Sequence, residues 1–159
     1  MFQSFKVTSR PEQGPPRLAD LRVELARESL DGFLIPRADA HQGEYVSARD
    51  ERLSWLTGFT GSAGFCAALI DIAGVFIDGR YRTQVKTQVA SDFTPVAWPE
   101  VSLAEWLIEH LPEGGKIGFD PWLHTVAQIE QARDALAGSD IELIGCDNEF
   151  LLTVRGKSF

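Results

Sequence analysis

One four-residue motif has side chains suited to binding an anion. Asp78-Gly79-Arg80-Tyr81 follows the apolar run 75–77, and functional side chains of open α/β sheets gather where strands end. The guanidinium of Arg80 presents a planar fork of donors that matches a carboxylate, and Asp78 could orient it. A surface ion pair between Arg80 and Asp78, with Tyr81 packing beside it, accounts for the same residues equally well.

A second polar cluster, residues 39–45, follows another short apolar run and contains His41 between two carboxylates. A catalytic metal site needs at least three converging ligands and an open position. The sequence has three histidines but no His-Glu-x-x-His motif and no pair of histidines at helical spacing. We therefore predict that this chain forms no metal site by itself.

Glycines recur at every third position in the segment 55–64, as Gly58, Gly61 and Gly64. Glycine permits positive φ, so such a segment either cradles an anion or turns tightly against a neighbour. The segment lacks the Lys-Ser/Thr ending of a phosphate-binding loop, and it precedes a strand instead of a helix. Gly-x-Ser-x-Gly, the motif of serine hydrolases, is also missing. A structural turn is the favoured interpretation.

A nuclease would use Asp39, Asp78 and Asp120 as strand-end carboxylates that hold two metal ions. Such an enzyme needs a basic surface for its substrate. This chain has 15 Lys and Arg against 23 Asp and Glu, a formal net charge of −8 and a pI near 4.8. The acidic balance disfavours both nucleic acid and anionic membrane surfaces as partners.

Hydrophobic periodicity and capping residues predict alternating helices and strands. The fold class expected is α/β, with a mixed β-sheet of about six strands flanked by helices. Antiparallel pairing is expected where two strands flank the turn after residue 70. Capping boxes begin two of the helices, at Ser102 and at Thr125. After Thr125, we expect Val126, Ile129 and Leu136 to face the core. The predicted helices are 17–30, 50–56, 81–90 and the two that follow Ser102 and Thr125, and the predicted strands are 33–35, 65–70, 75–77, 93–98, 116–119 and 141–144.

The chain length of 159 residues and a hydrophobic content of 44% suit a single domain. We expect an irregular N-terminal arm over 1–16, the domain over 17–147, and the start of a linker or a truncated end over 148–159. No apolar run approaches the roughly 20 residues of a membrane span, and the N-terminus has no signal-peptide plan, so a cytoplasmic location is expected. Cys66 and Cys146 are predicted to be buried free thiols.

Several blocks together resemble the amino-terminal domain of Xaa-Pro aminopeptidases, in the creatinase and prolidase superfamily. Their order and spacing are specific, and the likeness runs from about residue 17 to residue 147. The blocks are Ile35-Pro36, 39–45, Arg49-Asp50-Glu51-Arg52, 55–64 and Asp78-Gly79-Arg80-Tyr81.

The resemblance implies a supporting domain that precedes a catalytic domain of the pita-bread fold. That catalytic domain holds two divalent metal ions, often manganese, and removes an N-terminal residue that precedes proline. None of its metal ligands can be carried onto this chain, so the resemblance assigns no catalytic residue and no cofactor here. The resemblance implies that Arg80, Tyr81, His41 and Asp78 are candidates for facing the substrate or the catalytic domain. It also implies that the Gly-rich segment has a structural role.

The first expectation is therefore a non-catalytic N-terminal domain of a metal-dependent Xaa-Pro aminopeptidase. It would serve subunit assembly, as part of a homo-oligomer such as a dimer, and access of peptide to the active site. No activity is expected from this chain alone. The alternative is a free-standing module that binds a small anionic ligand or a peptide carboxylate through Arg80 and the Gly-rich segment. A domain cut from a larger protein should leave an apolar patch, with Trp98 or Trp122 as candidates.

Overall fold

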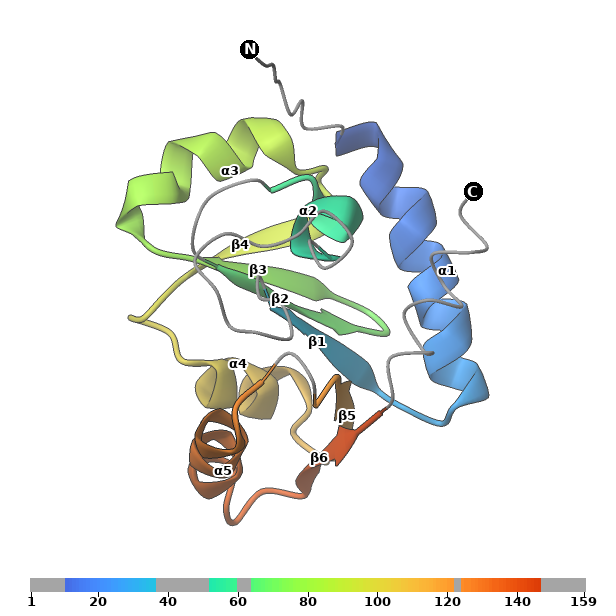
Figure 1. The fold of residues 1–159 in the computed structure, drawn as a ribbon, viewed down its shortest axis with the longest axis vertical. Helices are drawn as coiled ribbons and strands as arrows, with labels where there is room; N and C mark the ends of the chain where they lie inside the picture. Colours follow the sequence, from blue (N-terminus) through green and yellow to red (C-terminus); the bar gives the residue numbers. More distant parts are fainter. Residues whose placement is uncertain (1–10, 37–51, 60–63, 122–123, 147–159) are drawn as a thin grey trace.

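A six-stranded mixed sheet forms the centre of the molecule (Figure 1). The computed structural model describes residues 11–36, 52–59, 64–121 and 124–146. The strand order is β4-β3-β2-β1-β5-β6. Within the described residues, β2 is antiparallel to both of its neighbours, whereas the other three pairings are parallel. The strands are β1 Gly32–Pro36, β2 Phe65–Leu69, β3 Ala73–Ile77, β4 Phe93–Ala97, β5 Gly115–Phe119 and β6 Ile141–Gly145.

Helices cover both faces of this sheet, which confirms the predicted fold class. Alternate residues of β1 show the two faces: Phe33 and Ile35 belong to one buried cluster, and Leu34 belongs to the other. The first cluster includes residues of α1, α2 and α3, and the second includes residues of α4 and α5. The helices are α1 Gly14–Arg27, α2 Arg52–Thr57, α3 Arg82–Gln88, α4 Leu103–His110 and α5 Val126–Ala135, with 3-10 turns η1 Pro11–Gln13 and η3 Gly79–Tyr81.

The first helix begins earlier than the sequence pattern predicts. α1 starts at Gly14, and the expectation of an irregular chain up to residue 16 is wrong for 11–16, which form η1 and the first turn of α1. Pro15 and Pro16 lie in that first turn, where a missing backbone N–H leaves no helical hydrogen bond unmade. Prolines, which are common in loops, therefore form the first turn of this helix.

Both predicted capping boxes are present, but one core assignment is wrong. Ser102 and Thr125 each exchange two hydrogen bonds with the third residue of their helix. Ile129 and Leu136 are buried as predicted, whereas the side chain of Val126 is 75% exposed. Val126 is the first residue of α5, and the buried residues of that helix begin one turn later. The first turn of α5, residues 126–128, is therefore exposed.

The two cysteines are free thiols, as predicted, but they differ in environment. Cys66 lies in β2 with no exposed surface, and burial raises the pKa of its thiol to about 12. Cys146 follows β6 and is only half-buried. A thiol whose pKa is this high carries almost no thiolate at neutral pH, so Cys66 acts as a small apolar core residue.

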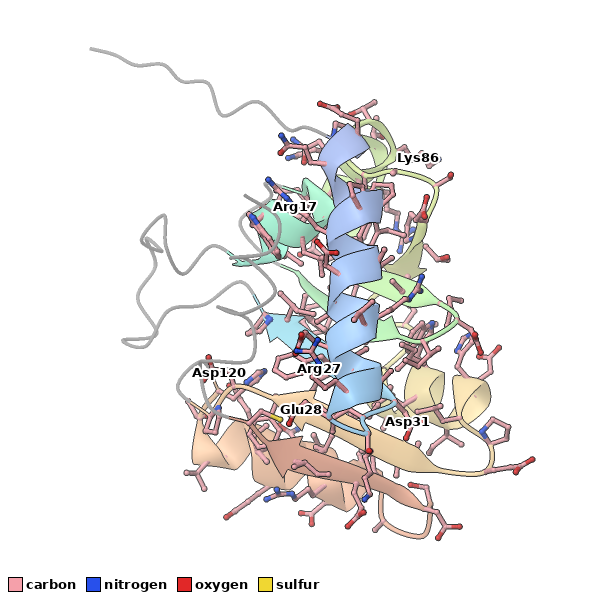
Figure 2. All side chains as sticks on the ribbon, turned by 90° about the vertical axis from the view of Figure 1, so that its right-hand side faces the viewer. Arg17, Arg27, Glu28, Asp31, Lys86 and Asp120 are labelled. Atoms are coloured by element: carbon pink, nitrogen blue, oxygen red, sulfur yellow. The ribbon has the colours of Figure 1, made fainter. Side chains whose placement is uncertain are left out.

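Asp31 joins the loop after α1 to the start of β5. Its carboxylate accepts a hydrogen bond from the backbone N–H of Lys116 at 2.8 Å, and its own N–H donates to the Lys116 carbonyl at 2.7 Å. Asp31 and Asp120 lie at opposite ends of β5 (Figure 2). Asp31 therefore belongs to the edge of the sheet opposite to the one where the parallel strands end.

We predict that Gly74→Ala destabilises the domain by about 1–3 kcal/mol, because it overpacks the second core cluster. A Cβ at Gly74 would lie 2.8 Å from Cζ2 of Trp106 and 3.1 Å from Cγ2 of Val96. Urea unfolding followed by tryptophan fluorescence measures the change. Gly79→Ala is the matched control, because a Cβ there meets nothing within 4 Å. Equal stability of the two variants would contradict this packing.

Candidate functional site

The candidate site is the edge of the sheet at which the five parallel strands end. β1, β3, β4, β5 and β6 point in the same direction, and the antiparallel β2 begins at this edge. The helices α3, α4 and α5 each start shortly after one of these strand ends. Ligands of open α/β sheets bind in this position. We call it the carboxyl edge.

The motif Asp78-Gly79-Arg80-Tyr81 forms the turn between β3 and α3. The N–H of Tyr81 donates to the Asp78 carbonyl at 3.1 Å, which closes this turn at the carboxyl edge. Asp78 and Tyr81 are both half-buried. The backbone of Arg80 lies in η3, whereas the direction of its side chain falls outside the part of the chain described. Backbone placement therefore agrees with the expected position of the motif.

The Gly-rich segment also lies at the carboxyl edge, beside the turn that contains Tyr81. The ring of Phe59 meets the ring of Tyr81 edge to face, with centroids 5.5 Å apart. A Cβ at Gly64 would lie 3.0 Å from the carbonyl oxygen of Phe76 and 3.1 Å from the Phe59 ring. The two sequence motifs, which are separate in the sequence, thus meet through one aromatic contact.

The described glycines of this segment adopt backbone conformations that favour glycine. Gly58 has φ 88° and Gly64 has φ 147°. Both positions support the structural interpretation of the segment. Gly61 and His41, which the sequence also singles out, lie outside the described residues.

Thr57 stabilises the chain where α2 ends and the glycines begin, a role that the sequence analysis did not predict. Its buried hydroxyl donates to the Leu53 carbonyl at 2.7 Å and accepts from the N–H of Phe59 at 3.0 Å. Phe59 is thereby held at the end of α2 with its ring against Tyr81. A Thr in the last turn of a short helix, directly before Gly, is the signal that could have revealed this role.

Trp98 adds an aromatic surface to the carboxyl edge, directly after β4. Its backbone N–H donates to the Ile77 carbonyl at 3.0 Å, and its ring meets the Phe65 ring edge to face, with centroids 6.1 Å apart. Phe65 in turn stacks on Phe76, with centroids 4.6 Å apart. Trp98 is 39% exposed, so it provides apolar surface as expected for one of the two candidate tryptophans. Trp122 lies outside the described residues.

The strand-end carboxylates cannot share a pair of metal ions. Asp78 follows β3 and Asp120 follows β5, and β2 and β1 lie between these strands. Three strand spacings of 4.7–4.9 Å separate the two positions by about 14 Å, whereas paired catalytic metals lie about 4 Å apart. Nor do the described residues contain a group of three or more His, Cys, Asp or Glu placed to hold a metal. The nuclease arrangement therefore fails for Asp78 and Asp120, and Asp39 lies outside the described residues.

The two described histidines have structural contacts. Nδ1 of His110 lies 2.9 Å from the Trp106 carbonyl at the end of α4. Nδ1 of His124 lies 3.1 Å from the Asp120 carbonyl, and its ring meets Phe119 edge to face. Burial lowers the pKa of His124, and the opposing influence of Asp120 is smaller. His124 is therefore held neutral at physiological pH.

Comparison with known proteins identifies the family. The family model of the creatinase/prolidase N-terminal domain matches residues 17–155. This chain belongs to that family. Human Xaa-Pro aminopeptidase 2 is 36% identical over 143 residues, which are 88% of this chain and 21% of the human protein. Aminopeptidase P1 of Arabidopsis thaliana is 37% identical over 130 residues, which are 80% of this chain and 20% of the plant protein.

Solved structures of family members have the same fold. The X-prolyl aminopeptidase of Caenorhabditis elegans, described as a cytosolic enzyme with a di-nuclear active site, matches with a TM-score of 0.79 and 28% identity. The match covers 88% of this chain and 25% of that one. The N-terminal domain of the cytoplasmic peptidase PepQ from Mycobacterium tuberculosis H37Rv matches with a TM-score of 0.70 and 28% identity, over 88% and 98% of the two chains.

This creatinase/prolidase N-terminal domain spans about a fifth of the length of the curated relatives that it matches. Their remaining length corresponds to sequence that is not present in the 159 residues. Among the described helices, none has the length and apolar character required to cross a membrane.

We predict that Thr57→Val destabilises the domain by about 1–3 kcal/mol, because the buried N–H of Phe59 loses its acceptor. Thr57→Ser keeps the hydroxyl and serves as the matched control. Chemical denaturation compares the variants, and near-UV circular dichroism reports on the packing of Tyr81. A stability equal to that of the Ser variant would contradict the role of the hydroxyl.

We also predict that His124 makes folding less favourable in weak acid. Its pKa is lowered in the folded state, so below the unfolded pKa of about 6.5 the unfolded chain binds a proton that the folded chain does not. The free energy of unfolding should fall from pH 7 toward the folded pKa of His124. In His124→Asn this fall should be smaller, as measured by urea titrations at successive pH values. Parallel pH profiles for the two proteins would contradict the prediction.

Proposed function

We propose that this chain is the non-catalytic N-terminal domain of a longer polypeptide with Xaa-Pro aminopeptidase activity. The parent protein removes an N-terminal residue that precedes proline, and this domain serves subunit assembly and access to the active site. The family match over residues 17–155 carries the proposal. It is supported by the relatives, which are named Xaa-Pro aminopeptidases and of which the chain spans only about a fifth.

The metal ions of the parent enzyme belong to the part of the polypeptide outside this domain. The Caenorhabditis elegans relative has a di-nuclear active site. In this domain, the wide separation of the strand-end carboxylates Asp78 and Asp120 does not suit a pair of ions. We assign two divalent ions, with manganese as the expected metal, to the catalytic pita-bread domain and none to this chain.

The carboxyl edge is the part of this domain that we assign to substrate access. Arg80 offers a carboxylate-binding fork in the turn after β3, and Phe59 supports Tyr81 beside it. Asp78 closes the turn through its carbonyl. His41 joins these residues as a candidate on the ground of its sequence block.

We propose that the parent protein is located in the cytoplasm and forms a homo-oligomer, such as a dimer. The relative from Caenorhabditis elegans is described as cytosolic. The net charge of −8 argues against nucleic acid and anionic membranes as partners. Exposed Trp98 supplies apolar surface suited to a subunit or domain contact.

The second candidate is a free-standing module that binds a peptide carboxylate. The contact between Phe59 and Tyr81 favours it, because this contact unites the Arg80 turn with the Gly-rich segment. Calorimetry with short peptides and with inorganic phosphate tests this function directly. Micromolar binding that is lost in Arg80→Ala would support the module, and no heat of binding across the panel would exclude it.

The peptidase proposal predicts different outcomes for the domain and for the longer polypeptide. With Mn²⁺ and an Xaa-Pro peptide, the 159-residue chain should release no amino acid, whereas the longer gene product should release the N-terminal residue. Arg80→Ala in the longer product should raise KM about tenfold or more, because it removes a charged contact to the peptide.

Arg82→Ala is the matched control, since the Arg82 side chain is exposed and paired with Glu100 at 2.5 Å. An unchanged KM in Arg80→Ala would remove Arg80 from substrate binding. Peptidase turnover by the rigorously purified 159-residue chain, or none by the longer product, would contradict the proposed function.

A further inference from the structure

A groove lies at the carboxyl edge beside α5, away from the turn that contains Arg80. Its volume is about 200 Å³. Small-molecule sites usually enclose roughly 300–1,000 Å³, so this groove suits one or two side chains better than a cofactor. Half of the residues that line it are apolar, namely Phe119, Pro121, Val126 and Ile129, and most of the surface inside the groove is apolar.

The wall of the groove is fixed, although its mouth is open. The guanidinium of Arg133 lies 5.9 Å from the centroid of the Phe119 ring and donates to the Leu143 carbonyl at 2.9 Å. His124 meets Phe119 from another side. Val126 lines the opening and is 75% exposed, the highest value among the exposed large hydrophobic residues described. A rigid apolar surface is therefore presented to whatever lies next to it.

The chain leaves the sheet directly beside this groove. A Cβ at Gly145, the last residue of β6, would lie 3.2 Å from Cγ of Pro121 and 3.6 Å from Cζ of Phe119. The next residue, Cys146, donates its N–H to the Phe119 carbonyl at 2.8 Å. Any polypeptide that continues from β6 therefore starts next to two residues of the groove wall.

We propose that the groove beside α5 docks an apolar segment of the polypeptide beyond this domain, and thereby fixes the domain against the catalytic portion. The inference rests on the proposed function. The relatives extend over about four to five times the matched length, and under the proposed function the additional polypeptide follows this N-terminal domain. Attachment next to the groove gives that partner a high effective concentration, so a small apolar contact is enough for docking. The charged rim, with Glu130 and Arg133, is typical of contacts between domains of one chain.

Amide hydrogen exchange tests the docking. The 159-residue chain is compared with the longer polypeptide that contains it. Docking should slow the exchange of amides 129–133 in α5 about tenfold in the longer polypeptide, and leave the amides of α1 unchanged. Equal exchange of α5 in both proteins would overturn the proposal.

A pair of substitutions identifies the groove as the surface involved. Val126→Glu should leave the Tm of the 159-residue chain unchanged, because the side chain is exposed there. In the longer polypeptide it should remove the protection of α5. Val23→Glu is the matched control, since Val23 is 54% exposed on α1, on the opposite face of the sheet. Two results would overturn the docking site. One is slow amide exchange of α5 that persists in Val126→Glu, and the other is an equal loss of this slow exchange in Val23→Glu.

The remaining outcomes separate the two proposals. An active longer polypeptide without protection of α5 overturns the docking and leaves the proposed function intact. A gene that encodes no polypeptide beyond this domain overturns both. Sedimentation of the 159-residue chain tests for a second copy in the groove: a dimer that Val126→Glu dissociates would overturn docking of the catalytic portion.

Discussion

The antiparallel placement of β2 between β1 and β3 is the constraint on which the carboxyl edge depends. Register pairs Phe65 with Phe76 and Cys66 with Val75, and the first pair stacks at 4.6 Å on one face of the sheet. Because β2 runs against its neighbours, it begins where β3 ends. The Gly-rich segment that precedes β2 is thereby brought beside the turn that follows β3, where Phe59 meets Tyr81. With a parallel β2, these two motifs would lie at opposite edges.

Periodicity and capping residues predicted most of this fold because they act locally. Hydrophobic periodicity over 17–30 identified α1, and the capping boxes at Ser102 and Thr125 identified the starts of α4 and α5. Errors arose where local signals have two meanings. Pro15 and Pro16 are typical of loops but also of the first helical turn, and Val126 fits the apolar spacing of α5 but has an exposed side chain.

The candidate site was only partly predictable, because its residues meet through the topology of the sheet. The sequence marked the Gly-rich segment and the Asp78–Tyr81 motif separately, but their contact depends on which strands are neighbours. The role of Thr57 depends on two hydrogen bonds at the end of a six-residue helix. The residues that line the groove beside α5 lie close together in the sequence, between 119 and 133, but the end of β6 reaches it only through the parallel pairing of β5 with β6.

We propose that these 159 residues form one part of a longer metallopeptidase, and the mass of the native polypeptide decides whether they do. An antibody raised against the purified chain would detect the protein in extracts of its source cells. We expect a band about four to five times larger than 17.6 kDa, because the match covers 25% of the Caenorhabditis elegans enzyme and 21% of the human relative. A single band at 17.6 kDa would show that the chain is not part of a longer peptidase.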